Sequence, residues 1–250
     1  MLITIKGFSF WVKFTKNKEQ TNKSEGHMTL KSLKYGLIQI LRSKQTWLLS
    51  FYSGLAFAPI SAFAGLWGVP FICQKYSLTK DMAATFVSLS FIGFAIGSPF
   101  AGWLSDTIKR RKLIMISGTA TSLISISTIL YWTHLKPIEL GILFLIFGYS
   151  SGFFFVSFAT MRENHDTSLS GTSIGFINMF NALFGAIFEP LIGYALDHEW
   201  THTLHNGTRV FSTHAYQFAL SILPAGLVIA LLCQFGIKET HCRNHTPADQ

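Results

Sequence analysis

Six long runs of apolar residues divide the chain, and short polar segments separate them. A helix needs about 20 predominantly apolar residues to cross the hydrocarbon core of a bilayer. The runs that qualify are Trp47–Ile72, Met82–Leu104, Leu113–Trp132, Ile138–Thr160, Thr172–Leu196 and Ala215–Ile237. The pattern therefore predicts an all-α membrane protein with six transmembrane helices. The third and sixth runs carry no strongly charged face, which predicts peripheral positions for them in the bundle.

A short motif at the end of the second run returns at the end of the fifth. The two copies read Pro99-x-x-Gly102-x-x-x-Asp106 and Pro190-x-x-Gly193-x-x-x-Asp197, 91 residues apart. Each copy closes the second helix of a three-helix group, but four consecutive basic residues follow only the first copy. The two copies are therefore expected at opposite membrane faces. Paired motifs at inverted positions predict two inverted three-helix repeats, as in many transporters.

Polar and basic segments flank the six runs. Residues 1–45 form a basic amino-terminal region, 46–238 the transmembrane bundle and 239–250 a cytoplasmic tail. Residues 1–14 are too short to span a bilayer and show no clear small-residue cleavage site, which argues against a signal peptide. Apolar residues recur at helical spacing between Leu30 and Leu41 beside basic ones, which predicts an amphipathic interfacial helix, with a poorly ordered connector as the alternative. Met28 is a second candidate start.

Composition and charge support the membrane assignment. The chain is 49% hydrophobic and 13% charged, whereas soluble domains carry about 25% charged residues. Three cysteines do not make a disulfide framework. The net charge of +8 does not indicate a nucleic-acid partner, because the basic residues cluster beside the ends of the runs. Such flanks meet anionic headgroups and set topology.

The loops divide the basic residues unequally between the two sides. Sixteen of the 20 lysines and arginines lie in the amino-terminal region, the second-to-third and fourth-to-fifth loops, and the tail. The other loops hold four. The positive-inside rule then predicts that both termini are cytoplasmic. The expected location is the bacterial inner (plasma) membrane.

The fifth run contains the one acidic residue that lies well inside a span. Glu189 belongs to a stripe of small and polar residues at helical spacing. The stripe consists of Gly171, Gly175, Asn178, Ala182, Gly185, Glu189 and Gly193. A carboxyl group is costly inside a membrane and marks a candidate functional site. Glu189 is therefore a candidate for proton coupling or solute contact, and the alternative is a neutral acid that bonds to a neighbouring helix. Both interpretations point the side chain into the bundle.

Catalytic and metal-binding patterns are missing from the runs. They contain no nucleophile–base pair at catalytic spacing, no phosphate-binding loop and no His-Glu-x-x-His motif. The sequence therefore predicts neither an enzyme nor a cofactor nor a metal site.

Two pairs of glycines lie one helical turn apart within the runs. The pairs Gly93-x-x-x-Gly97 and Gly148-x-x-x-Gly152 predict close helix packing within the bundle.

The segment Gly102–Lys112, GWLSDTIKRRK, resembles the signature loop of the major facilitator superfamily, in which glycine, aspartate and a basic cluster follow one another. A second glycine is usual where Lys109 stands, and such a departure is typical of the second half of these twelve-helix transporters. GLWGVPF at 65–71 and GTSIGFINM at 171–179 also look like that half. The resemblance covers roughly residues 30–240 and implies half of a major facilitator fold.

The resemblance also implies a function, which is secondary active transport of a small solute by alternating access. It assigns the cytoplasmic gate to the signature loop, with Gly102, Asp106, Arg110 and Arg111 as its residues. The candidate cavity or coupling residues are Tyr52, Phe63, Trp67, Tyr149, Asn178 and Glu189. The expected partners are membrane lipids, the solute and, as candidate coupling ions, protons.

A single six-helix half supplies only one wall of such a cavity. The sequence leaves open a homodimer, a partner that carries the other half, and an inactive truncated transporter fragment. A membrane scaffold or regulator that does not transport is the alternative function.

Overall fold

The structure is a computed structural model that describes residues 30–201, 203–205 and 208–243. The chain divides into two units, residues 1–39 and residues 40–250. Six helical spans in the described residues are long and apolar enough to cross a membrane, which confirms the six predicted runs. The spans are Lys44–Tyr76, Lys80–Ile108, Arg111–Tyr131, Pro137–Glu163, Thr167–His198 and Thr213–Gly236, numbered here first to sixth.

Several spans are built from more than one helical element. The first contains α3 (Lys44–Ala58), the π-helix η1 (Pro59–Trp67) and α4 (Gly68–Tyr76). The second is α5 (Lys80–Ile108), and the third is α6 (Arg111–Tyr131). The fourth contains α7 (Pro137–Ser151), the 3-10 helix η2 (Gly152–Phe155) and α8 (Val156–Glu163). The fifth contains η3 (Thr167–Leu169) and α9 (Ser170–His198), and the sixth contains α10 (Thr213–Leu220) and α11 (Ile222–Gly236).

Two smaller elements lie outside the spans. Helix α2 (Leu30–Arg42) confirms the helix predicted before the first span, and its place at a membrane surface stays a prediction. A short hairpin of β1 (Leu204–His205) and β2 (Thr208–Arg209) lies in the fifth-to-sixth loop.

Hydroxyl side chains begin three of the spans. Ser43, Thr79 and Ser212 each accept a hydrogen bond from the backbone N–H three residues further along the chain. Such an N-cap satisfies a backbone donor that the helix itself leaves unpaired. These caps fix where the first, second and sixth spans begin.

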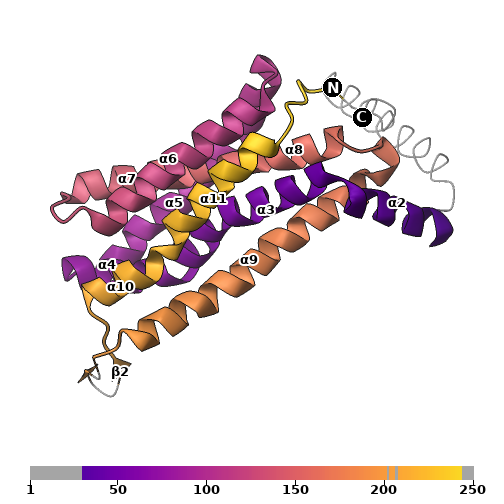
Figure 1. The fold of residues 1–250 in the computed structure, drawn as a ribbon. Helices are drawn as coiled ribbons and strands as arrows, with labels where there is room; N and C mark the ends of the chain where they lie inside the picture. The colour runs from indigo at the N-terminus through magenta and orange to yellow at the C-terminus, as the bar shows by residue number, and fades with distance from the viewer. Residues whose placement is uncertain (1–29, 202, 206–207, 244–250) are drawn as a thin grey trace, which may run out of the picture. The chain divides into compact units, whose positions relative to one another are not determined.

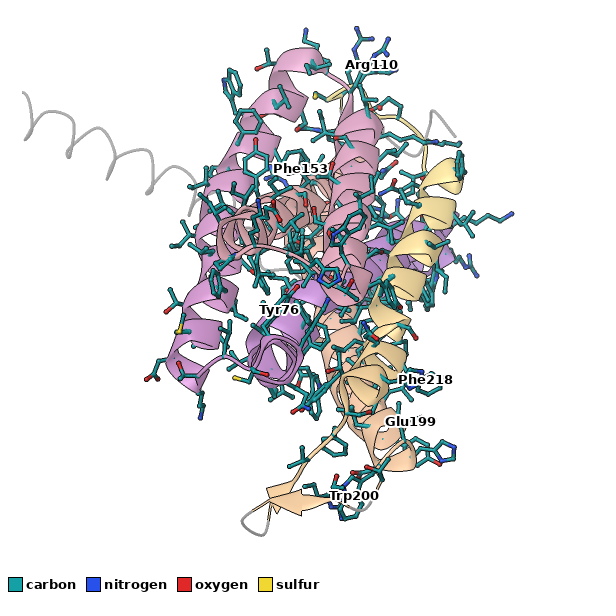
Figure 2. The ribbon with its side chains drawn as sticks, turned by 90° about the vertical axis from the view of Figure 1, so that its left-hand side faces the viewer. Tyr76, Arg110, Phe153, Glu199, Trp200 and Phe218 are labelled. Carbon is teal, nitrogen blue, oxygen red and sulfur yellow. The ribbon has the colours of Figure 1, made fainter. Side chains whose placement is uncertain are left out.

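The two copies of the repeated motif lie at opposite ends of the bundle. Arg110 follows the first copy at one end, and Glu199 and Trp200 follow the second copy at the other end (Figure 2). This arrangement confirms the inverted placement that the repeat predicted. The second copy also gains a partner at its end, because Arg209 Nη1 lies 2.7 Å from Asp197 Oδ1.

The spans pack in a sequence of neighbours that differs from their order in the chain. Helix α5 packs on α7, α7 on α6, α6 on α11, α11 on α3, and α3 on α9. Figure 1 shows α3 between α11 and α9. The second and fifth spans therefore stand at the two ends of this series.

Glycines allow the closest of these contacts, between α5 and α7. A Cβ atom on Gly148 would lie 1.8 Å from Ser90 O, and one on Gly97 would lie 2.0 Å from Tyr149 O. Gly93 is also tight against the backbone of α7. Only glycine permits backbones to approach in this way. The helix-packing prediction for the two glycine pairs is confirmed.

The second and fifth spans are the most exposed spans of the chain by itself. The second and fifth spans bury 28% and 33% of their most apolar windows, whereas the third and sixth bury 50% and 39%. The second and fifth spans are exposed because the outer faces of α5 and α9 have no partner within the described residues. The peripheral positions expected for the third and sixth spans in the assembled protein stay a prediction.

The first and fourth spans are both interrupted near their middle. The first changes to a π-helix at Pro59–Trp67 and the fourth to a 3-10 helix at Gly152–Phe155. Under the repeat spacing of 91 residues, Gly152–Phe155 corresponds to residues 61–64, which lie within η1. The irregular backbone is thus a shared feature of both repeats. Such segments occur often at functional sites in helices.

Candidate functional site

A buried ion network lies beside the signature loop, at the end of the second span. Arg111 is 6% exposed, and its Nη2 donates to Glu163 Oε1 at 2.7 Å. Its Nη1 lies 2.5 Å from Asp106 Oδ1 and donates to Ser105 Oγ at 2.6 Å. A guanidinium group that makes several charge-assisted bonds is held in one geometry. The network therefore ties α6 to the ends of α5 and α8.

The segment after the sixth span docks onto the same network. The Glu239 carboxylate accepts hydrogen bonds from the backbone N–H groups of Arg111 at 2.8 Å and Lys112 at 3.0 Å, which caps the start of α6. Thr240 Oγ1 donates to Glu163 Oε2. Burial raises the pKa of the Cys242 thiol, which lies against Ser105 O. The Glu239 carboxylate lies at the N-terminus of α6, where the helix dipole favours a negative charge.

Two positions of the signature loop, Gly102 and Lys109, differ in why glycine suits them. Lys109 ends α5 with a φ of 56°, in the left-handed region that favours glycine. This backbone conformation gives the physical reason why glycine is usual at this position. A Cβ atom on Gly102 would have nothing within 4 Å, and Gly102 lines a hollow of about 420 Å³. Asp106 and Arg111 line the same hollow.

The structure separates the two candidate arginines of the loop. Arg111 lies at the centre of the network, whereas Arg110 is exposed and forms no ion pair with an acid in the described residues. Arg111 and Asp106 are thus brought together as predicted, and Arg110 is not. The gating role of the loop stays a prediction.

A second hollow, of about 370 Å³, lies between the first, second and fifth spans. Glu189 from α9 lines it and accepts a hydrogen bond from Ser61 Oγ at 3.1 Å. The π-helix η1 supplies Ser61, so the irregular backbone of the first span positions the donor. The remaining lining residues are Phe57, Ile60, Gly65, Leu66, Phe91 and Phe94. We call this space the Glu189 hollow.

Trp67 fastens the first span to the fifth beside this hollow. Its Nε1 donates to the backbone oxygen of Glu189 at 3.3 Å, and its ring lies against Gly193. Gly185, one turn from Glu189, lies against Ser61. The small residues in the second half of the stripe therefore do face the bundle, as predicted.

The first half of the stripe does not face the bundle. Gly171, Gly175, Asn178 and Ala182 are all exposed in this chain. The first half of α9 packs on α3 through a different face, which carries Phe176, Phe180 and Asn181. The inward orientation expected for Glu189 therefore does not extend to these four positions, which form an open face of small and polar residues.

Three aromatic candidates take part in contacts between helices. Tyr52 is fully buried, and its hydroxyl accepts a hydrogen bond from Thr119 at 3.4 Å. Phe63 is fully buried and stacks against Phe144 at 6.0 Å. Tyr149 packs on Phe100 of α5. Tyr52 and Phe63 are thus not accessible to a solute in this chain, whereas Tyr149 is half-buried and its role as a solute contact stays a prediction.

Sequence reasoning missed two buried polar contacts. Ser53 Oγ donates to Asn181 Oδ1 at 2.8 Å between α3 and α9, three residues beyond the predicted Asn178. Glu163 is the main partner of Arg111 and was not singled out. A signal existed for Glu163, because it is an acid at the end of the fourth span, on the side where the basic cluster lies.

A buried histidine joins the fourth-to-fifth loop to the first span. His165 is 3% exposed, and its Nε2 lies 2.8 Å from Thr46 Oγ1. Burial lowers the pKa of the His165 imidazole, although the nearby Asp166 carboxylate acts in the opposite direction. The neutral ring is therefore favoured at this contact.

Comparison with known proteins connects this architecture to one family. The family model described as Major Facilitator Superfamily matches residues 1–189 and 46–235. A probable hexose phosphate transport protein of Chlamydia muridarum is 30% identical over 177 residues, which cover 64% of this chain and 36% of the relative. The uncharacterised MFS-type transporter YuxJ of Bacillus subtilis is 23% identical over 201 residues, covering 80% and 47%.

A solved structure shares the fold. The inward open conformation of the xylose transporter XylE from E. coli superposes with a TM-score of 0.61 at 13% identity. The match covers 78% of this chain and 47% of XylE. This chain thus spans less than half the length of the relatives it matches. With a matching family model over most of its length, the chain belongs to the major facilitator superfamily.

Proposed function

We propose that this chain forms one six-helix half of a secondary transporter that moves a small solute by alternating access. Membership of a family of solute transporters supports the part of this proposal that concerns solute transport. Solute sites in this architecture lie near the middle of the membrane, between two six-helix halves. The Glu189 hollow lies beside the irregular segment in the middle of the first span, which suits such a site.

The proposal of a second half is supported mainly by the exposed faces of α5 and α9, which no other helix of the described chain covers. Positions 171, 175, 178 and 182 of α9 are small or polar and exposed within a membrane span. A Cβ atom on Gly171 or Gly175 would have nothing within 4 Å. Lipid offers no hydrogen-bond partner to a side chain such as that of Asn178. A second six-helix half, or a second copy of this chain, would cover this face.

Site-directed crosslinking tests the second half. In a chain whose three cysteines are replaced by serine, Asn178→Cys should form a crosslink to another polypeptide in native membranes. Leu232→Cys is the matched control, because Leu232 is 61% exposed on α11 and should remain uncrosslinked. Mass spectrometry of the product distinguishes a second copy from a separate half. Equal crosslinking at both positions, or none at either, would contradict the proposal.

Both termini are proposed to lie in the cytoplasm, in the bacterial inner membrane. The support is the excess of lysine and arginine on one side of the six spans. Reporter fusions after Lys112 and after Lys238 should give a cytoplasmic signal, and a fusion after Arg209 should give an external one. An external signal after Lys112 would reverse the orientation.

The lining of the Glu189 hollow does not suit a sugar phosphate, the solute in the name of the Chlamydia muridarum relative. A phosphorylated sugar is an anion, and its phosphate requires cationic or N–H donors. The residues that line the Glu189 hollow include a carboxyl group but no lysine, arginine or histidine. The hollow therefore supplies none of the cationic side chains that would bind a phosphate group.

A further inference from the structure

We infer that the Glu189 hollow binds an organic cation with an apolar body, through the Glu189 carboxylate and the surrounding aromatic rings. This inference rests on the proposed function and names the class of solute that this half would contact. It follows from the charge of the hollow, from a comparison of the two repeats and from the rings that line it.

The carboxyl group of Glu189 is only partly used by the chain. Ser61 Oγ donates to Oε1 at 3.1 Å, and no residue in the described part of the chain bonds to Oε2 or forms an ion pair with Glu189. Trp67 bonds to the backbone oxygen of Glu189 and leaves the side chain free. An unpaired carboxylate in an apolar setting favours a cationic ligand.

The internal repeat shows that the fold does not need this carboxyl group. A shift of 91 residues relates Ser61 to Gly152 and Ser98 to Glu189, so the two helix crossings can be compared directly. At the second crossing, Gly152 lies against Ser98, and the Ser98 hydroxyl bonds to Phe94 O of its own helix. The same crossing is thus built once with an acid and once without. The carboxyl group is therefore present only at the crossing of the first and fifth spans, and helix packing does not require it.

Aromatic rings complete a surface that suits a cation. Phe57, Phe91 and Phe94 line the hollow together with Glu189. Phe91 is 49% exposed, so its ring is available to a ligand. Ring faces attract cations, and the attraction grows when water is excluded. An anion would meet the same rings and the carboxylate with repulsion.

The test measures binding to the full chain in lipid nanodiscs, with empty nanodiscs as the blank. Tetraphenylphosphonium and tetraphenylborate have the same shape and opposite charge, and neither titrates. Tetraphenylphosphonium should bind saturably and at least tenfold more tightly than tetraphenylborate. Binding that is absent, or equal for the two ions, would overturn the inference.

Variants locate the binding at the hollow. Glu189→Gln should weaken tetraphenylphosphonium binding about tenfold. Glu199→Gln, at the end of the same helix but outside the hollow, should leave the binding unchanged. Glu189→Asp keeps the charge and should retain the preference for tetraphenylphosphonium over tetraphenylborate. Phe91→Leu replaces an exposed ring and should weaken binding several-fold without loss of folding. Unchanged binding in Phe91→Leu and Glu189→Gln would overturn the site.

The binding assay tests the solute class and the crosslinking assay tests the second half, so a negative result in one does not decide the other. Loss of the expected cation selectivity would refute the solute class but leave the crosslinking result at Asn178 intact. Loss of the crosslink would refute the second half, while the cation would still bind to the single chain.

Discussion

Replacing Gly148 by alanine should separate α5 from α7 and lower the stability of the whole bundle. The added Cβ atom would lie 1.8 Å from the backbone oxygen of Ser90, and a backbone atom cannot move aside as a side chain can. Overpacking of a well-packed site costs about 1–3 kcal/mol, and occasionally more. A contact with backbone should fall at the upper end of that range. Thermal unfolding of the purified chain in detergent measures the effect.

Gly102 provides the matched control on α5. A Cβ atom there has nothing within 4 Å, so Gly102→Ala should be neutral or should stabilise the helix by up to about 1 kcal/mol. Gly97→Ala, on the same helix, should resemble Gly148→Ala, because its Cβ would lie 2.0 Å from Tyr149 O. If Gly148→Ala and Gly102→Ala unfold at the same temperature, the two helices do not pack as closely as described.

Much of the fold follows from patterns that are local in the sequence. Six apolar runs predicted six spans, and the glycine pairs at 93 and 97 and at 148 and 152 predicted where two helices meet. These predictions succeed because length, hydrophobicity and the absence of a Cβ atom act within one helix. The repeated motif also predicted which ends of the bundle its two copies occupy (Figure 2).

The site was harder to predict, because burial depends on which neighbour a helix meets. Tyr52 and Phe63 stand on the first span like Trp67, yet both are fully buried against other helices. Asn178 and Asn181 differ by less than one turn, but Asn178 is exposed and Asn181 accepts a bond from Ser53. A sequence pattern shows which residues share one face of a helix, but it does not show which neighbouring helix that face contacts.

Distance along the chain hid the partners of Arg111. Glu163 lies 52 residues after it, and Glu239 lies 128 residues after it. A basic cluster on a short loop is equally consistent with topology alone, because nothing local shows which arginine will be buried. The structure resolves this question in favour of Arg111 over Arg110.

Removing Glu163 should destabilise the chain more than any change at an exposed acid. Arg111 would keep its exposed partner Asp106 but would lose the buried carboxylate that accepts bonds from its Nε and Nη2 atoms. Breaking a buried ion pair from one side costs about 3–5 kcal/mol, because a buried charge is left without its partner. Glu163→Ala and Arg111→Ala should both fall in this range, as measured by unfolding in detergent.

Two comparisons separate this effect from a general loss of charge. Arg110→Ala removes an adjacent but exposed guanidinium group and should cost little. Asp197→Ala breaks the exposed pair with Arg209 at the other end of the bundle, and exposed pairs contribute about 0–1 kcal/mol.

The double variant Arg111→Met with Glu163→Leu decides the physical cause. With both charges removed, neither is left buried and unpaired, so the double variant should be more stable than either single alanine variant. Asp106 is 65% exposed at its side chain and can be solvated when Arg111 is lost. Additive losses in the double variant would mean that Arg111 and Glu163 stabilise the chain through separate contacts. In that case the Glu239 cap on α6 and the bond from Thr240 to Glu163 would be the stronger ties at this end of the bundle.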